Sequence, residues 1–189
     1  MDLGAEKKAG SSGGAAGALT GPSIMPGGNP AAWPHVKDIF QALPATLDAC
    51  RPCCDWARRD RAGPYLQTAP TGIPHGHLHT TSESYALLRQ VLSIEPQAMS
   101  EIFKDWNEGE LDSYLIEITG EILAKIDEDT GRPMVDLILD TAGQKGTGKW
   151  TGIDSLQLGA PVTAITQAVF ARALSFLHDA RVAAAKALQ

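Results

Sequence analysis

The sequence has few cysteines, no excess of basic residues and no long apolar run, and each shortage excludes a class of protein. Three cysteines in 189 residues are an odd number and argue against a disulfide framework. The 16 Lys and Arg against 22 Asp and Glu give a net charge of −6, which attracts neither nucleic acid nor an anionic membrane. No apolar run approaches the roughly 20 residues that span a bilayer, and residues 1–8 lack the apolar core of a signal peptide. The sequence therefore predicts a cytoplasmic protein without a nucleic-acid or membrane partner.

One cysteine pattern resembles half of a zinc site. Cys50-x-x-Cys53, followed by Cys54 and by the alternating histidines of residues 75–79, offers thiolates and imidazoles at metal-binding spacing. No second C-x-x-C is present in the chain. We therefore expect no metal site.

The composition and the apolar spacing are typical of a mainly helical globular protein. Hydrophobic residues make up 43% of the chain and charged residues 20%, and 189 residues can bury one domain plus a piece of another. Residues 1–30 are rich in Gly, Ala, Ser and Pro and carry almost no periodicity. Apolar residues then recur at helical spacing around residues 34–43, 82–92, 99–106, 111–126 and 161–188. A short strand is expected near Cys53, and residues 134–139 could form another.

A glycine-rich segment, Asp140-Thr-Ala-Gly-Gln-Lys-Gly-Thr-Gly-Lys-Trp150, is the most distinctive motif. Glycine lets backbone N–H groups converge on an anion, while lysine and threonine add a charge and a hydroxyl. Gly143-x-x-x-x-Gly148-Lys149 matches the first part of a nucleotide-binding P-loop. Trp150 stands where that motif needs a magnesium-binding Ser or Thr, which argues against an NTPase.

The same segment resembles, almost letter for letter, the phosphate-binding loop of the decarboxylating 6-phosphogluconate dehydrogenases. Further segments agree with that family in the same order. They are Ser12-Gly-Gly14, Gly21 to Gln41, Pro52-Cys-Cys-Asp-Trp56, Trp106-Asn107, and Glu110 to Thr119. The resemblance covers the chain from about Ser12 to its C-terminal end.

The resemblance implies a mainly α fold in two parts. Residues 1–57 correspond to the end of the family's NADP-binding α/β Rossmann-type domain, and residues 58–189 to a truncated form of its all-helical C-terminal domain. The family's cofactor is NADP, but this sequence contains no G-x-G-x-x-G after a strand. The resemblance thus predicts a fragment from the middle of the family's chain, and it supports neither NADP binding by this chain nor any assigned cofactor-binding residue.

The family's catalytic residues are replaced in this chain. The resemblance implies a lysine as general base and a glutamate as general acid, and these positions are Gln67 and Pro74. Neither side chain can exchange a proton near pH 7, so no catalytic residue is assigned. Because prolines interrupt helices, we also expect that Pro64, Pro70 and Pro74 prevent this segment from forming the family's long helix.

The family's substrate contacts are better preserved. Ser12, Gly13 and Gly14 match its contacts to the substrate carboxylate and hydroxyls. The phosphate ligands are matched by Lys145, Thr147 and Arg172, and a phosphate-contacting tyrosine is replaced by His75. The alternative interpretation of Lys145 and Arg172 is that they are solvated surface side chains.

Two functional interpretations remain open. In the first, the chain is a partial 6-phosphogluconate dehydrogenase of the pentose phosphate pathway, inactive by itself. In the second, it is a catalytically dead module that binds 6-phosphogluconate or associates with itself or a full-length paralogue. The resemblance implies a homodimer, and helix faces without their usual partners would leave an apolar surface.

Overall fold

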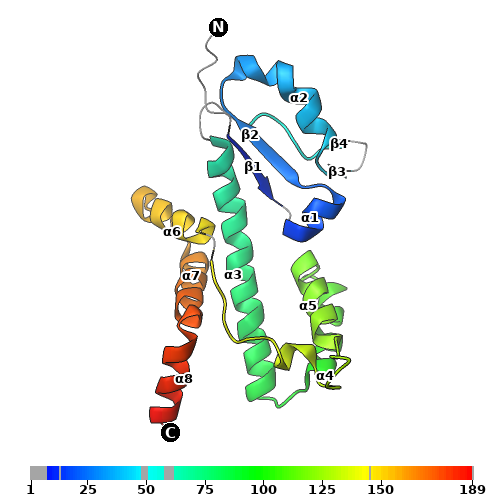
Figure 1. Ribbon diagram of the computed structural model, residues 1–189, viewed down its shortest axis with the longest axis vertical. Coiled ribbons are helices and arrows are strands. Elements are labelled where there is room, and N and C mark those ends of the chain that lie inside the picture. The colour runs from blue at the N-terminus through cyan, green and yellow to red at the C-terminus, as the bar shows by residue number, and fades with distance from the viewer. Residues whose placement is uncertain (1–7, 13, 48–50, 58–61, 145, 189) are drawn as a thin grey trace. The chain divides into compact units, whose positions relative to one another are not determined.

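The computed structural model describes residues 8–12, 14–47, 51–57, 62–144 and 146–188. The chain divides into two compact units, Met1–Ile73 and Pro74–Gln189, with the division inside helix α3 (Ala62–Gln90) (Figure 1). The sequence predicts a domain boundary between residues 57 and 58, and that boundary stays a prediction.

The first unit contains two small antiparallel sheets and two helices. Strands β1 (Lys8–Ser12) and β2 (Ser23–Gly27) pair from Lys8↔Gly27 to Ser12↔Ser23, with α1 (Gly14–Thr20) between them. After the 3-10 turn η1 (Pro30–Ala32) and helix α2 (Trp33–Ala42), strand β3 (Thr46–Leu47) pairs with β4 (Arg51–Pro52). Cys54 forms a parallel bridge with Ile24. These elements confirm the expected helix after Pro34 and the extended segment near Cys53.

A glycine is required in the short connection between α1 and β2. Gly21 has φ +104°, and a Cβ at this position would lie 2.4 Å from the backbone nitrogen of Ala45. A larger residue would be strained and would collide with backbone, so the two segments can approach only at a glycine.

Helix α3 contradicts the expectation drawn from its prolines. The helix runs without a break over 29 residues, through Pro64, Pro70 and Pro74. Pro64 is the third residue, where its missing N–H has no intrahelical partner. Pro70 and Pro74 are interior and each removes one hydrogen bond at about 3 kcal/mol. Tertiary contacts of the later turns of α3, such as Gly76 against Ala164, offset this cost, because tertiary packing overrides local helix propensity.

The core of the second unit lies between α3, α4 (Pro96–Asn107) and α5 (Tyr114–Ala124). Its buried residues are Met99, Phe103, Ile116 and Leu123, with Tyr85 and Leu88 of α3 packed against them. Ser100 donates a buried hydrogen bond of 2.7 Å from its Oγ to the carbonyl oxygen of Gly120, which ties α4 to α5. The apolar stripe expected over residues 99–106 lies in this core. The stripe expected over residues 111–126 is wrong in its face, because Ile116 and Leu123 are buried while Ile122 is 46% exposed.

The C-terminal part departs from the sequence prediction in three places. Residues 134–139 form no strand, and Met134–Asp136 is a 3-10 turn, η3. The glycine-rich segment leads into a helix that was not predicted, α6 (Thr147–Leu158). The expected single helix over 161–188 is divided into α7 (Thr163–Phe176) and α8 (His178–Ala187), because Leu177 between them has the non-helical dihedrals φ −80° and ψ 46°.

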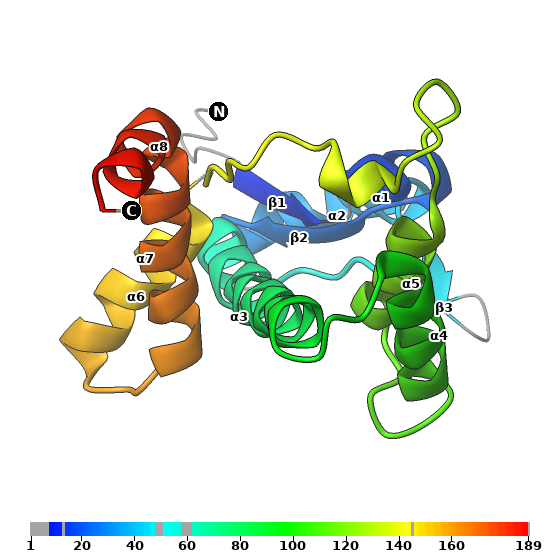
Figure 2. The same ribbon diagram turned by 90° about the horizontal axis from the view of Figure 1, so that it is seen from below.

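Helices α6 and α7 cross closely, as both views show (Figures 1 and 2). The buried face of α6 consists of Gly148, Gly152 and Ser155. A Cβ on Gly148 would lie 2.9 Å from Cγ2 of Val169, and one on Gly152 would lie 2.9 Å from Cγ2 of Thr166. Small residues on α6 thus set the distance between the two helices.

Among the described residues, no helix is both long enough and apolar enough to cross a membrane. Helices dominate the second unit, which confirms the expected mainly α architecture with a short α/β piece before it.

Candidate functional site: a basic loop at the start of α6

The first turn of α6 presents a positive helix end to the loop before it. Gly146, the N-cap residue, has φ +103° and no side chain with which to cap the helix. The first turn contains no acidic residue and carries Lys149. The backbone N–H groups of a first turn have no intrahelical partner and attract anions. Thr147, a predicted phosphate ligand, is the first residue of this helix.

Arg172 ties α7 to the same loop. Its Nη1 donates a hydrogen bond of 3.1 Å to the carbonyl oxygen of Gly143, 29 residues away in sequence. The guanidinium has five N–H donors in a planar fork suited to phosphate, and this bond uses one of them. Arg172 is half-buried, so it is not a freely solvated surface side chain.

The loop is held a second time, by residues that sequence reasoning did not single out. Arg181 of α8 donates from Nη1 to Oδ2 of Asp140 at 2.8 Å and from Nη2 to the Asp140 carbonyl oxygen at 2.6 Å. The Ala142 N–H donates to Oγ of Ser175 at 3.0 Å. Ala142 and Ser175 are 33 residues apart in the sequence, and Asp140 and Arg181 are 41 apart, so no local sequence pattern predicts these contacts.

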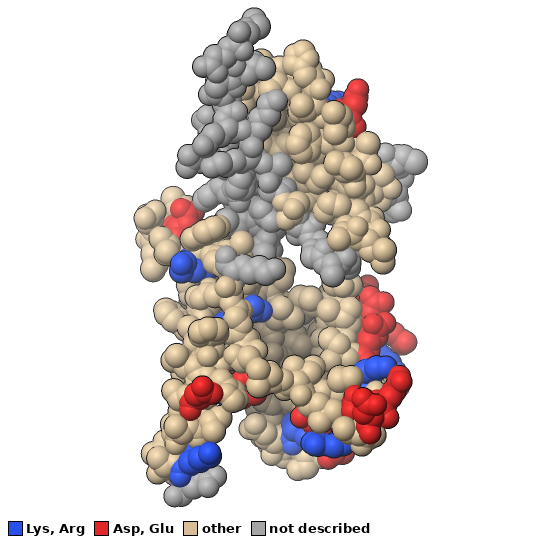
Figure 3. All heavy atoms as spheres, in the orientation of Figure 1, with Lys and Arg blue, Asp and Glu red and all other residues tan. Residues whose placement is uncertain are grey.

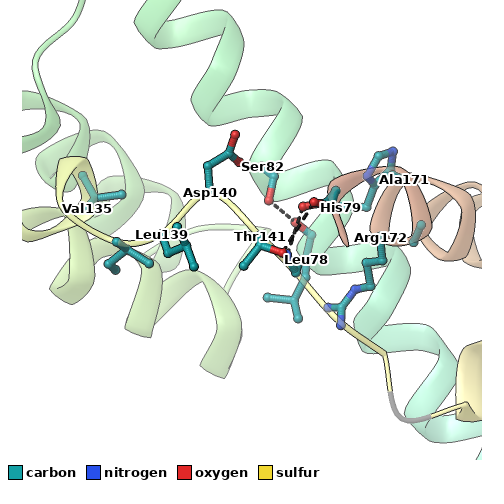
Figure 4. Close-up of a pocket in the computed structure, with 13 residues that line it drawn as sticks. Leu78, His79, Ser82, Val135, Leu139, Asp140, Thr141, Ala171 and Arg172 are labelled. Carbon is teal, nitrogen blue, oxygen red and sulfur yellow. Dashed lines mark hydrogen bonds between the residues drawn. The ribbon is translucent and has the colours of Figure 1, made fainter. Parts of the chain in front are cut away.

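A pocket of about 540 Å³ lies between α3, the segment before the loop, and α7 (Figure 4). Its lining is mainly apolar, with Leu78, Leu139 and Ala171 among the residues drawn. Arg172, Asp140 and Thr141 supply polar groups to its wall. Arg172 therefore lines the pocket and also bonds to the glycine-rich loop.

His75 of α3 lies against the first turn of α6. A Cβ placed on Gly148 would be 3.4 Å from Cδ2 and 3.6 Å from Cγ of the His75 ring. The imidazole is half-buried. One signal for this position was present in the sequence, since His75 stands where the resembling family has a phosphate-contacting tyrosine.

The remaining predicted substrate residues belong to the first unit or lie outside the described residues. Ser12 ends β1 opposite Ser23, and Gly14 begins α1. Gly13 and Lys145 lie outside the described residues. Within the second unit, Thr147 begins α6 and Arg172 of α7 bonds to Gly143 in the loop before α6, while Ser12 and Gly14 are described within the first unit.

The positions of the family's base and acid both lie on α3. Gln67 is in the helix, and Pro74 is exposed on it. In the described part of the chain, no group of three His, Cys, Asp or Glu side chains is arranged to hold a metal ion. Cys53 and Cys54 are free thiols, and burial, followed by the charge of Asp55, raises the pKa of Cys54. Cys50 lies outside the described residues.

Comparison with known proteins identifies the family. The model of the 6-phosphogluconate dehydrogenase C-terminal domain matches residues 63–189, and that of the NAD-binding domain of 6-phosphogluconate dehydrogenase matches residues 8–56. The chain belongs to the 6-phosphogluconate dehydrogenase family. The decarboxylating 6-phosphogluconate dehydrogenases of Candida albicans and Homo sapiens are 51% and 49% identical to it over 180 residues, which is 95% of this chain. The chain spans 35% and 37% of their lengths.

Solved structures agree with this assignment. The 6-phosphogluconate dehydrogenase of Plasmodium falciparum, solved in its apo form and in complexes with NADP+ and with 6-phosphogluconate, aligns with 97% of this chain and 39% of its own. The TM-score is 0.87 at 40% identity. The 3-hydroxyisobutyrate dehydrogenase of Salmonella typhimurium, at 18% identity and a TM-score of 0.57, covers 86% of this chain and 51% of its own and shares the fold alone.

NADP is the cofactor of the Plasmodium relative, but the residues present here do not fit a complete dinucleotide site. Pyrophosphate sites of this kind need a glycine-rich turn between a strand and a helix of a parallel β-α-β unit. The two sheets described in the first unit are antiparallel pairs, and the sequence has no G-x-G-x-x-G. We therefore derive no step through a nicotinamide.

Proposed function

We propose that this chain is part of a decarboxylating 6-phosphogluconate dehydrogenase, an oxidoreductase of the cytoplasmic pentose phosphate pathway, and that alone it binds 6-phosphogluconate without turning it over. The observation that carries the proposal is the hydrogen bond from Arg172 to Gly143. This bond joins a predicted phosphate ligand to the loop that leads to Thr147.

The proposed phosphate site combines three kinds of donor. A phosphomonoester carries close to two negative charges at neutral pH. Arg172 supplies a fork of N–H groups, Thr147 a hydroxyl, and the first turn of α6 its backbone N–H groups. We assign Lys145 to the same phosphate, and Ser12, Gly13 and Gly14 to the carboxylate and hydroxyl end of the substrate.

The lack of turnover follows from Gln67 and Pro74. The family's reaction needs a base to take the proton of the C3 hydroxyl and an acid to protonate the enediol that remains after carbon dioxide is lost. A glutamine amide does not titrate near pH 7, and proline has no side-chain proton. Loss of one general acid or base commonly lowers the rate by about 10²–10⁴-fold, and here both are replaced.

The test is isothermal titration of the purified chain with 6-phosphogluconate, run beside an NADP reduction assay. We expect binding without NADP reduction. Arg172→Ala should weaken binding by about tenfold or more, because a hydrogen bond to a charged group contributes about 1.5–3 kcal/mol. Arg132→Ala is the matched control, since Arg132 is an exposed arginine in a turn. Absence of binding would overturn the proposed site, and turnover would overturn the assignment of Gln67 and Pro74.

A second role, as a subunit-interaction module, is supported by exposed apolar side chains on the C-terminal helices. Trp150, Leu156, Phe170, Leu174 and Phe176 are between 54% and 82% exposed. In contrast, acidic side chains gather over α4 and α5 (Figure 3). We propose that the apolar helices pair with a second copy of the chain or with a full-length paralogue.

Sedimentation velocity tests the pairing. The chain should sediment as a dimer or larger species, and Phe170→Glu should shift it toward the monomer. Leu111→Glu, at a leucine that is also exposed but lies outside these helices, should leave the distribution unchanged. A monodisperse monomer at all concentrations would contradict this role.

A further inference from the structure

We infer that Arg181 of α8 is a positioning residue for phosphate binding. Arg181 holds the first residues of the glycine-rich loop without contacting the phosphate itself, and through them it orients the guanidinium of Arg172. This inference deepens the proposed function and rests on it.

Arg181 makes three hydrogen bonds to two segments that are distant from each other in the sequence. Its Nη1 donates to Oδ2 of Asp140 at 2.8 Å, and its Nη2 donates to the carbonyl oxygens of Asp140 and Ser175 at 2.6 and 3.1 Å. The guanidinium is planar, so acceptors on both of its terminal nitrogens fix its orientation as well as its position. These bonds, the Arg181 clamp, join the start of the loop to the C-terminal end of α7.

The interruption between α7 and α8 makes one of these acceptors available. In an unbroken helix the carbonyl oxygen of Ser175 would accept from the N–H four residues later. Leu177 has non-helical dihedrals, α7 ends at Phe176, and the last carbonyl groups of a helix have no intrahelical partner. The carbonyl oxygen of Ser175 accepts from Arg181 instead. The break that the sequence did not predict therefore contributes to the clamp.

Ser175 also holds the next two residues of the loop. Its Oγ accepts from the N–H of Ala142 at 3.0 Å, and its carbonyl oxygen accepts from Oγ1 of Thr141 at 3.5 Å. Residues 140–142 are thus each bonded to α7 or α8, and Gly143 follows them directly. A backbone held at three successive residues has already lost most of its conformational freedom, so the carbonyl group of Gly143 is fixed before a ligand binds.

The carbonyl oxygen of Gly143 in turn orients Arg172. Nη1 of Arg172 donates to this oxygen at 3.1 Å, and the ion pairs of the described residues include none to its guanidinium. Arg181, in contrast, is paired with Asp140. The two arginines therefore differ in role. The charge of Arg172 is available to a phosphate, whereas the charge of Arg181 is neutralised where it holds the loop.

The test measures the 6-phosphogluconate affinity of the whole chain and its variants by isothermal titration. Arg181→Ala should weaken binding by about tenfold, because a small misplacement of a binding group can cost up to about 10²-fold. Arg89→Ala is the matched control. Arg89 is 31% exposed against 29% for Arg181, and it also bonds to a carboxylate and a carbonyl oxygen, those of Glu95 and Ile94, between α3 and α4. Arg89→Ala should lower the stability to urea about as much as Arg181→Ala does and leave the affinity unchanged.

A double-mutant cycle separates positioning from a general loss of stability. If Arg181 acts through Arg172, adding Arg181→Ala to Arg172→Ala should lower the affinity by less than about twofold, because the positioned group is already absent. A purely structural role would weaken binding equally in both backgrounds, and that result would overturn the inference.

Asp140→Asn tests the clamp without removing the arginine and serves if Arg181→Ala does not fold. It removes a negative charge near the proposed phosphate site, yet it should weaken binding by about threefold, because the charged acceptor of the clamp is lost. Arg181→Lys should bind more tightly than Arg181→Ala, since an ammonium group still pairs with Asp140 but cannot act as a planar fork. Tighter binding by Asp140→Asn than by the unaltered chain would overturn the inference, because Asp140 would then act through its charge alone.

The results also distinguish this inference from the proposed function. Loss of affinity in Arg172→Ala, with unchanged affinity in both Arg181→Ala and Arg89→Ala, overturns the positioning role and leaves the proposed function intact. Failure of the unaltered chain to bind 6-phosphogluconate overturns the proposed function and, with it, this inference.

Discussion

Gly148→Ala tests the close crossing of α6 and α7, on which the candidate site depends. The added Cβ would lie 2.9 Å from Cγ2 of Val169, well inside the 3.5–4.0 Å at which carbon atoms pack. Valine is stiff at χ1, so its methyl group cannot easily turn away. Overpacking of this kind costs about 1–3 kcal/mol, and replacing a helical glycine by alanine returns about 1 kcal/mol. We expect a net destabilisation of about 1 kcal/mol.

Gly120 of α5 is the matched control, because it is also a buried helical glycine. A Cβ at Gly120 would lie 3.5 Å or more from its neighbours, which is ordinary contact. Gly120→Ala should therefore be neutral or stabilise the chain by up to about 1 kcal/mol. Urea unfolding followed by circular dichroism measures both variants.

A double-mutant cycle isolates the proposed collision. Val169→Ala removes the methyl group that the Cβ added by Gly148→Ala would strike, so the two changes should couple by about 1 kcal/mol rather than add. Gly148→Ala should also weaken 6-phosphogluconate binding, since it displaces the first turn of α6. If Gly148→Ala stabilises the chain as Gly120→Ala does, and the cycle is additive within about 0.3 kcal/mol, the close crossing is wrong.

Three further outcomes follow from the described contacts. Phe103→Ala should destabilise the second unit by about 3–5 kcal/mol in urea unfolding, because Phe103 is 0% exposed in the α4–α5 core; a loss below about 1 kcal/mol would contradict that core. Pro74→Ala should stabilise α3 by about 1–3 kcal/mol, because it restores an N–H donor to the carbonyl of Pro70, and hydrogen exchange should show the new amide to be protected. Burial raises the pKa of Cys54 above its ordinary 9.0, so the folded state favours the protonated thiol. The stabilisation that this thiol gives the folded state is therefore complete below pH 9.0 and is lost as pH rises through the higher folded-state pKa. Cys54→Ala should remove that decline above pH 9.0, and an unchanged pH slope would refute the assignment.

Helical periodicity predicted part of the core of the second unit, because side chains on one helix face recur at a fixed local spacing. Met99 and Phe103 recur at the spacing of one helix face and are buried as expected. The stripe read over residues 111–126 was wrong in its face, because Ile116 and Leu123 are the buried residues of α5 while Ile122, which belonged to the expected stripe, is 46% exposed. The same reasoning failed at α3, where local proline chemistry predicted an interruption. Packing along the later turns of α3 outweighs the two lost hydrogen bonds, and no local pattern reports such packing.

The sequence by itself determined the family, the apolar face of α4 and the residue types of the glycine-rich loop, because these depend on neighbours along the chain. Tertiary structure alone decided that Arg172 bonds to Gly143, that Arg181 holds Asp140 and that His75 lies against Gly148. Each of these contacts joins residues on different elements, 29 and 41 positions apart for the two arginines. The physical reason is that helix packing sets such distances, and packing depends on the small residues of α6 fitting against α7.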